Sequence, residues 1–150
     1  MITGNRALYE QVILEHNKTP RNFREIEDAD RKVEGYNPLC GDHFTIFVKL
    51  DGDTIADISF SGKGCAISKA SASLMTAMLK GKPKSEAETL FNRLHDLVTS
   101  NPDDPVDEKA LGKLQVFSGV REYPVRIKCA TLAWHALAAA FEGKEEVSTE

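Results

Sequence analysis

The segment Asn37–Phe44, N-P-L-C-G-D-H-F, places a thiol, a carboxylate and an imidazole within four positions. Residues two apart in an extended segment point to the same side, so Cys40 and Asp42 can face one metal ion. Gly41 between them lets the backbone bend. His43 should point the other way, and we expect it to lie outside the site. The segment therefore predicts one part of a metal site.

Two further cysteines, Cys65 and Cys129, could supply the other ligands. Cys65 follows Gly-Lys-Gly at the expected start of a helix, and Cys129 lies in the first turn or so of a helix opened by Pro124. Helix N-termini carry unpaired N–H groups and a partial positive charge, which lower the pKa of a thiol. Three sulfurs and one oxygen suit tetrahedral zinc, or iron with a preference for thiolates; the predicted ligands are Cys40, Asp42, Cys65 and Cys129.

The number of cysteines, three, argues against a disulfide framework in a chain without a signal peptide. Buried inert thiols, a metal site or a reactive thiol remain possible. Each cysteine stands at a predicted element boundary, whereas an inert core cysteine more often sits in mid-element among large apolar neighbours. Position therefore favours a metal site or a reactive thiol.

A local antiparallel hairpin should bring two of these cysteines together. Apolar residues alternate with other residues from His43 to Lys49, and Asp51-Gly52-Asp53 predicts a tight turn. The return strand carries Ile55, Ile58 and Phe60. The outer ends of this hairpin lie next to Cys40 and Cys65, and a third short strand is predicted at Arg31–Tyr36.

Helical patterns surround these strands. The expected helices cover 5–17, 65–79, 85–99, 108–117 and 125–141, and Ser85 with Glu88 forms a capping-box signature for the third. Segregated strands and helices predict an α+β fold, with a small three-stranded antiparallel sheet packed by helices on one face. We expect a single domain over 1–150, with a polar, frayed tail at 145–150.

Composition excludes several classes of protein. The net charge is −4, and the charges are mixed without a basic stripe or tail, so we expect no nucleic-acid partner. No apolar run approaches the roughly 18–20 residues of a membrane helix, and the first residues lack the pattern of a signal peptide. We therefore expect a cytoplasmic protein without a membrane partner.

Three stretches resemble the NifU/IscU family of iron–sulfur assembly proteins: G-Y-N-P-L-C-G-D, F-S-G-K-G-C-A-I-S-K-A-S-A-S-L-M-T and V-R-I-K-C-A-T-L-A-W. The similarity runs from the first helix to the last, and it is greater to the SufU branch than to the IscU branch. Lys128 stands where IscU-type proteins carry a His immediately before the third Cys. The connection between Cys65 and Cys129 is also longer than in the IscU pattern, with the extra segment around Leu94–Gln115.

The resemblance implies an IscU/NifU N-terminal-like fold and a zinc ion held by the four predicted ligands. It implies a protein that accepts persulfide sulfur from a SufS-type cysteine desulfurase and passes it on for iron–sulfur cluster assembly by downstream proteins. By position, Cys40 is the acceptor and thus the catalytic thiol. Two alternatives stay open: a non-catalytic scaffold that binds iron or a transient iron–sulfur cluster, and a binding module whose zinc is only structural.

Two basic residues, Arg126 and Lys128, flank Cys129 near the helix start. They could dock a partner or offset the negative charge of three thiolates and a carboxylate. They could equally be solvated surface residues.

Overall fold

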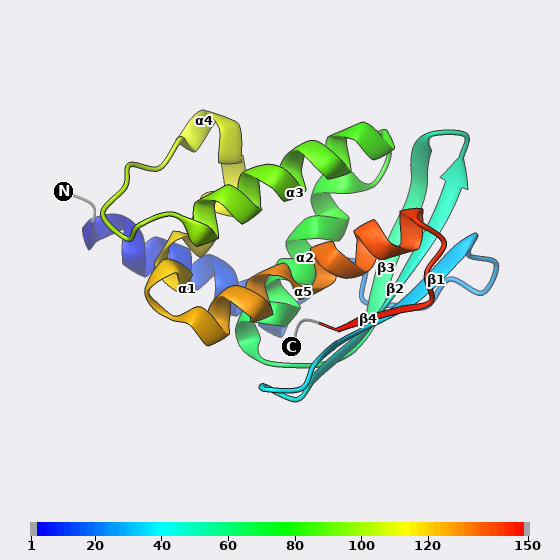
Figure 1. The fold of residues 1–150 in the computed structure, drawn as a ribbon, viewed down its shortest axis with the longest axis horizontal. Coiled ribbons are helices and arrows are strands. Elements are labelled where there is room, and N and C mark those ends of the chain that lie inside the picture. Colours follow the sequence, from blue (N-terminus) through cyan, green and yellow to red (C-terminus); the bar gives the residue numbers. More distant parts are fainter. Residues whose placement is uncertain (1–2, 149–150) are drawn as a thin grey trace.

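The computed structural model describes residues 3–148 (Figure 1). In chain order the elements are α1 (Thr3–Lys18), β1 (Arg31–Asn37), β2 (Asp42–Asp51), β3 (Thr54–Lys63), α2 (Ala66–Leu79), α3 (Lys84–Thr99), α4 (Glu108–Leu111), the 3-10 helix η1 (Gly112–Glu122), α5 (Pro124–Phe141) and β4 (Glu146–Ser148). The α+β class is confirmed. None of the helices in the described range is long and apolar enough to cross a membrane.

The sheet has the strand order β3-β2-β1-β4, with β1, β2 and β3 antiparallel as predicted. It contains four strands rather than three, because residues 146–148 pair parallel to β1. The backbone N–H of Glu34 donates to the carbonyl of Glu145, and Val147 packs against the core. The expected frayed tail thus contains a strand, while residues 149–150 lie outside the described range. A three-residue strand with one apolar side chain leaves almost no periodic signal.

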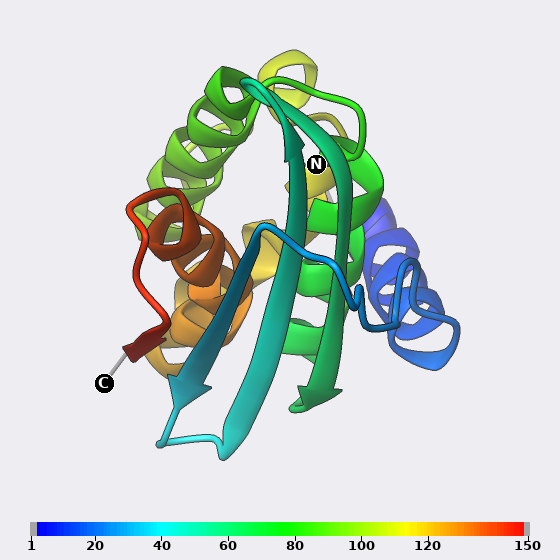
Figure 2. The ribbon, with the colours of Figure 1, turned by 90° about the vertical axis from the view of Figure 1, so that its right-hand side faces the viewer.

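One face of the sheet is apolar and is covered by α2 and α5, as Figure 2 shows. The buried residues on this face include Val33, Phe44, Ile46, Ile58 and Phe60. The segment between α1 and β1 crosses the other face (Figure 2), and it enters β1 where the N–H of Asp30 donates to the carbonyl of Val48 at 2.8 Å. Successive side chains of β2 therefore point alternately toward the helix-covered core and toward this crossing segment.

The start of α3 differs from the predicted capping box. The N-cap residue is Pro83, whose side chain makes no capping hydrogen bond, and Ser85 lies inside the first turn. The β2–β3 hairpin holds this end instead, since the N–H of Lys84 donates to the carbonyl of Asp53 at 2.8 Å. A tertiary contact has replaced the local cap.

The helix predicted over 108–117 is α-helical only as far as Leu111, and a 3-10 helix continues to Glu122. Leu114, Phe117 and Val120 are all buried. A spacing of three residues puts these side chains on one side of a 3-10 helix, whereas an α-helix would spread them. Burial of this stripe favours the tighter helix.

Candidate metal and thiol site

The turn between β1 and β2 carries the first two predicted ligands. Cys40 is exposed in this turn, and its N–H donates to the carbonyl of Asn37 at 3.2 Å. Gly41 has a φ of +71°, a left-handed conformation that suits glycine. The bend turns the carboxylate of Asp42 inward, where only 2% of the residue is exposed.

His43 points away from this carboxylate, as strand alternation predicts. Its side chain is exposed, its ring stacks on Tyr36 with centroids 4.4 Å apart, and Nε2 lies 3.1 Å from Oε1 of Glu34. His43 therefore belongs to the outer face of the sheet.

Cys65 is the N-cap residue of α2, as predicted for a helix start. Its Sγ accepts a hydrogen bond from the backbone N–H of Ser68 at 3.4 Å. Asp42 lies beside it: Oδ1 accepts the backbone N–H of Cys65 at 2.8 Å, and Oδ2 lies 3.9 Å from the Cys65 sulfur. The carboxylate thus bridges the start of β2 and the start of α2.

The close approach of these two elements depends on Gly62 at the end of β3. Its φ is +125°, and a Cβ at this position would overlap the carbonyl oxygen of His43 and lie 2.8 Å from Cα of Phe44. Only glycine lets the chain pass this close to β2 before it reaches Cys65. The Gly-Lys-Gly sequence therefore sets the position of the second thiol.

Cys129 lies deeper in its helix than the sequence predicts. It is the sixth residue of α5, in the second turn, and is 1% exposed. The argument from unpaired N–H groups at a helix N-terminus therefore does not apply to it. Its sulfur instead lies 3.3 Å from the Cys40 sulfur, so residues 89 positions apart in the chain are neighbours.

The predicted ligands converge in space. One ligand atom each from Cys40, Asp42 and Cys129 lies within 4.8 Å of the other two, a grouping that could hold a metal ion. Cys65 adjoins this group through its contact with Asp42. Three sulfurs and a carboxylate converging from a turn and two helices fit the donor set that tetrahedral zinc takes.

The two inner thiols interact strongly. The pKa of Cys65 is lowered to about 6, first by a hydrogen bond with the Cys129 thiol and also by donors on Ser68. The pKa of Cys129 is raised by the same interaction and by burial. The two thiols therefore shift each other's pKa in opposite directions.

The structure adds Asn37, whose role the sequence did not predict. This side chain is fully buried, and its Nδ2 lies 3.4 Å from Oδ2 of Asp42 and 3.5 Å from the sulfur of Cys129. Among the residues that the structure describes, its Oδ1 has no hydrogen-bond partner. A buried amide that donates to two candidate ligands orients them. The only sequence signal was an Asn at the start of the turn that carries Cys40.

A groove of about 760 Å³ opens beside the thiols. All three cysteines line it, together with residues of α1, α2, η1 and α5. Leu14, Tyr123 and Val125 give it an apolar rim and are 60%, 41% and 48% exposed. Arg126 also lines it, with its guanidinium 4.4 Å from the centre of the Tyr123 ring. Lys128 lines a different pocket, so the two basic residues predicted to flank the site face different cavities.

Comparisons with known proteins show the family of this chain. Residues 8–142 match the family model described as NifU-like N terminal domain. The chain is similar to the zinc-dependent sulfurtransferase SufU of Bacillus subtilis, with 44% identity over 87% of each chain. It is also similar to the iron–sulfur cluster assembly scaffold protein IscU of Streptococcus pyogenes, with 41% identity over 90% of this chain and 83% of the relative.

Solved structures share the fold. A crystal structure of a candidate iron–sulfur cluster assembly scaffold protein for the SUF system, from Fervidobacterium islandicum AW-1, superimposes with a TM-score of 0.81. The two chains are 36% identical, and the match covers 90% of this chain and 97% of the other. The IscU/NifU-like fold expected from the sequence is therefore confirmed.

Proposed function

The chain belongs to the NifU-like N terminal domain family, and we propose that it is a zinc-dependent sulfurtransferase of iron–sulfur cluster assembly. In this proposal it accepts persulfide sulfur from a SufS-type cysteine desulfurase and passes it to downstream cluster-assembly proteins. The observation that carries the proposal is the exposed thiol of Cys40, 3.3 Å from the buried sulfur of Cys129 and open to a groove. The similarity to a relative named as a zinc-dependent sulfurtransferase supports it.

The residues proposed to hold zinc are Cys40, Asp42, Cys65 and Cys129. Zinc, when bound, supplies a positive charge that keeps thiols deprotonated at neutral pH. The chain contributes the arrangement: Asp42 is held by the backbone of Cys65, and Asn37 donates toward Asp42 and Cys129. The inner residues are buried or half-buried, so they suit a holding role.

Cys40 suits the acceptor role because it is the exposed thiol and lies in a turn rather than a helix. Its thiolate attacks the terminal sulfur of a persulfide on the partner. A new sulfur–sulfur bond forms on Cys40 as the bond in the donor breaks, and the donor cysteine leaves as a thiolate. The proton of the persulfide travels with the transferred sulfur. Cys40 then carries the persulfide that a downstream thiol can take by the same exchange.

The groove gives the partner a surface beside this thiol. Its apolar rim of Leu14, Tyr123 and Val125 is exposed, which is typical of a surface that another protein covers. Arg126, held over the Tyr123 ring, adds a positive charge at the rim. We propose docking of the desulfurase here, with Arg126 rather than Lys128 as the basic contact.

The second candidate function is that of a scaffold protein. In this case the same residues would hold an iron–sulfur cluster while it is assembled. It is favoured by the similarity to relatives named as scaffold proteins. Against it stands Lys128, since a lysine is a poor ligand and this one lines a different pocket from the thiols. The purified protein separates the two: bound colourless zinc favours the sulfurtransferase, and a brown cluster favours the scaffold.

The decisive test is sulfur transfer from a SufS-type desulfurase supplied with labelled cysteine. The wild-type protein should accelerate turnover and gain one labelled sulfur on Cys40, read by peptide mass spectrometry. Cys40→Ala should remain folded by circular dichroism and should neither accelerate turnover nor accept label.

Acceptance of label by Cys40→Ala, together with its loss in Cys65→Ala, would assign the acceptor role to Cys65 instead. A different result would point to a zinc ion with a purely structural role. In that case Cys40→Ala would lose its folded structure, and no specific sulfur-transfer step would be lost.

A further inference from the structure

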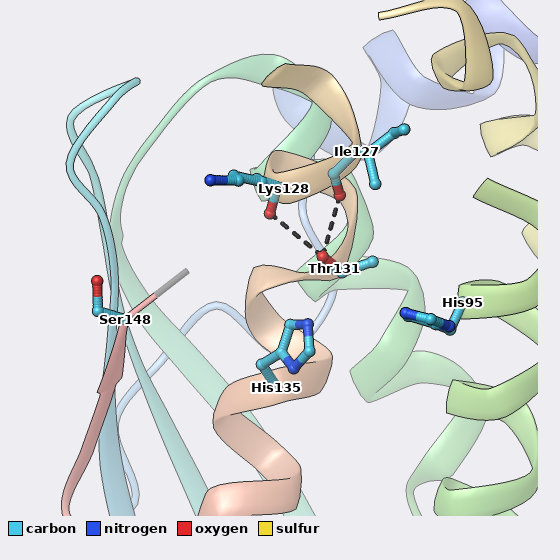
Figure 3. A pocket seen from close by; sticks show the side chains of 6 residues that line it. All are labelled: His95, Ile127, Lys128, Thr131, His135 and Ser148. Atoms are coloured by element: carbon cyan, nitrogen blue, oxygen red, sulfur yellow. Dashed lines mark hydrogen bonds between the residues drawn. The ribbon is translucent and has the colours of Figure 1, made fainter. Parts of the chain in front are cut away.

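A second pocket, of about 250 Å³, lies between α3, α5 and β4 (Figure 3). It shares no lining residue with the thiol groove. Its lining combines one lysine, two histidines, two hydroxyls and one apolar side chain: Lys128, His95, His135, Thr131, Ser148 and Ile127. β4 contributes Ser148 to this lining.

The side chains in this pocket that can carry a charge are all basic. No carboxylate is among its lining residues, and neither Lys128 nor His95 forms an ion pair among the residues that the structure describes. Burial lowers the pKa of His135, and the charge of His95 lowers it further. The two imidazoles therefore repel each other when both are protonated, and an anion between them would remove that repulsion.

The imidazoles are held in place by one aromatic ring. Phe91 on α3 meets His135 edge-on with centroids 4.9 Å apart, and it meets His95 edge-on at 6.4 Å. The hydroxyl of Thr131 donates to the carbonyl of Ile127 at 3.0 Å, inside α5 (Figure 3). Thr131 is therefore already engaged within its helix, and the charged donors that line the pocket are the imidazoles and the lysine ammonium.

We propose that this pocket binds a phosphoryl anion, as inorganic phosphate or a phosphate ester, and binds it more tightly when His95 and His135 are protonated. The titratable and charged lining groups are His95 from α3 and Lys128 and His135 from α5, while β4 contributes Ser148. The volume accommodates one phosphate with several waters, since a water occupies about 30 Å³. The proposal is independent of the sulfurtransferase function.

The test uses the full chain and inorganic phosphate, with sodium chloride at matched ionic strength as the blank. At about pH 5, well below the reference imidazole pKa of about 6.5, phosphate should saturably shift the ring NMR resonances of His95 and His135. The resonances of His43, on the outer face of the sheet, should not respond. Affinity at about pH 8 should be weaker.

Lys128→Met should weaken phosphate binding by roughly tenfold, the effect of one lost charge-assisted hydrogen bond. Lys109→Met, an exposed lysine on α4, is the matched control and should bind as the wild type does. Equal binding of glycerol phosphate would show that the phosphoryl group is recognised, and binding of inorganic phosphate alone would assign the free ion. An equal response of His43, or the same shifts with chloride, would overturn the proposal.

Discussion

Oδ1 of Asp42 accepts the backbone N–H of Cys65 at 2.8 Å. This bond joins the first residue of β2 to the N-cap of α2, so one carboxylate fixes the place where strand and helix meet. Its other oxygen lies toward the Cys65 sulfur and the amide of Asn37. Asp42 is therefore a structural anchor as well as a candidate ligand.

Replacement of Asp42 should test both roles. Asp42→Ala leaves the N–H of Cys65 without its partner and should lower the free energy of unfolding by about 1–3 kcal/mol. It also removes the oxygen donor, so zinc should be released at lower concentrations of a competing chelator. Asp51→Ala, an exposed carboxylate at the far end of β2, is the control and should change neither quantity. Unaltered zinc retention in Asp42→Ala would remove Asp42 from the ligand set.

Asn37 should matter to the site without binding the metal itself. Asn37→Ala removes the donor shared by Asp42 and Cys129, and loss of such an outer partner costs roughly 10–100-fold in metal affinity. Chelator competition for bound zinc measures this change. Asn92→Ala, on the exposed side of α3, should retain zinc as the wild type does. Equal zinc affinity in both variants would reduce Asn37 to a packing residue.

Gly62→Ala should destabilise the protein strongly. The φ of +125° is unfavourable for alanine, and its Cβ would meet the backbone of His43 and Phe44. Backbone strain alone costs about 1–3 kcal/mol, and the overlap adds to it. Gly119→Ala is the matched control, because a Cβ there meets no atom within 4 Å. Urea unfolding should separate the two variants, and equal midpoints would contradict this account.

Stability should fall in acid partly because of His16. This side chain is 8% exposed, and Nδ1 lies 2.7 Å from Oγ of Ser73. Burial, and then the charge of Arg21, lower the pKa of His16 in the folded state. The unfolded chain therefore binds the proton more readily, so stability is present above about pH 6.5 and is lost as the pH falls below it.

His16→Gln should flatten this part of the pH dependence, measured as the urea midpoint across the range. Ser73→Ala is the control: it removes the hydrogen bond but keeps the buried imidazole, so the protein should be less stable with the slope preserved. His135 contributes a slope of the same sign, since its pKa is also lowered. An unchanged slope in the His16→Gln, His135→Gln double variant would disprove the assignment.

Local sequence patterns predicted much of the fold. The alternation along β2 and the Asp-Gly-Asp turn predicted the β2–β3 hairpin, which the structure confirms. The i, i+2 relation of Cys40 and Asp42 predicted that both could face one point while His43 faced away, and their placement in the structure agrees. These predictions succeed because neighbouring residues alone determine side-chain direction in a strand.

Long-range packing decided the rest. The sequence by itself determined which residues could bind a metal, and the hairpin that brings Cys65 beside Asp42. Only the packing of α5 on β1 placed Cys129 next to Cys40 and Asn37, because these residues share no local periodicity. β4 pairs with β1 from the far end of the chain, and its Ser148 joins residues of α3 and α5 in lining the Lys128 pocket. Burial and partner atoms from distant segments, which no local pattern encodes, set these features.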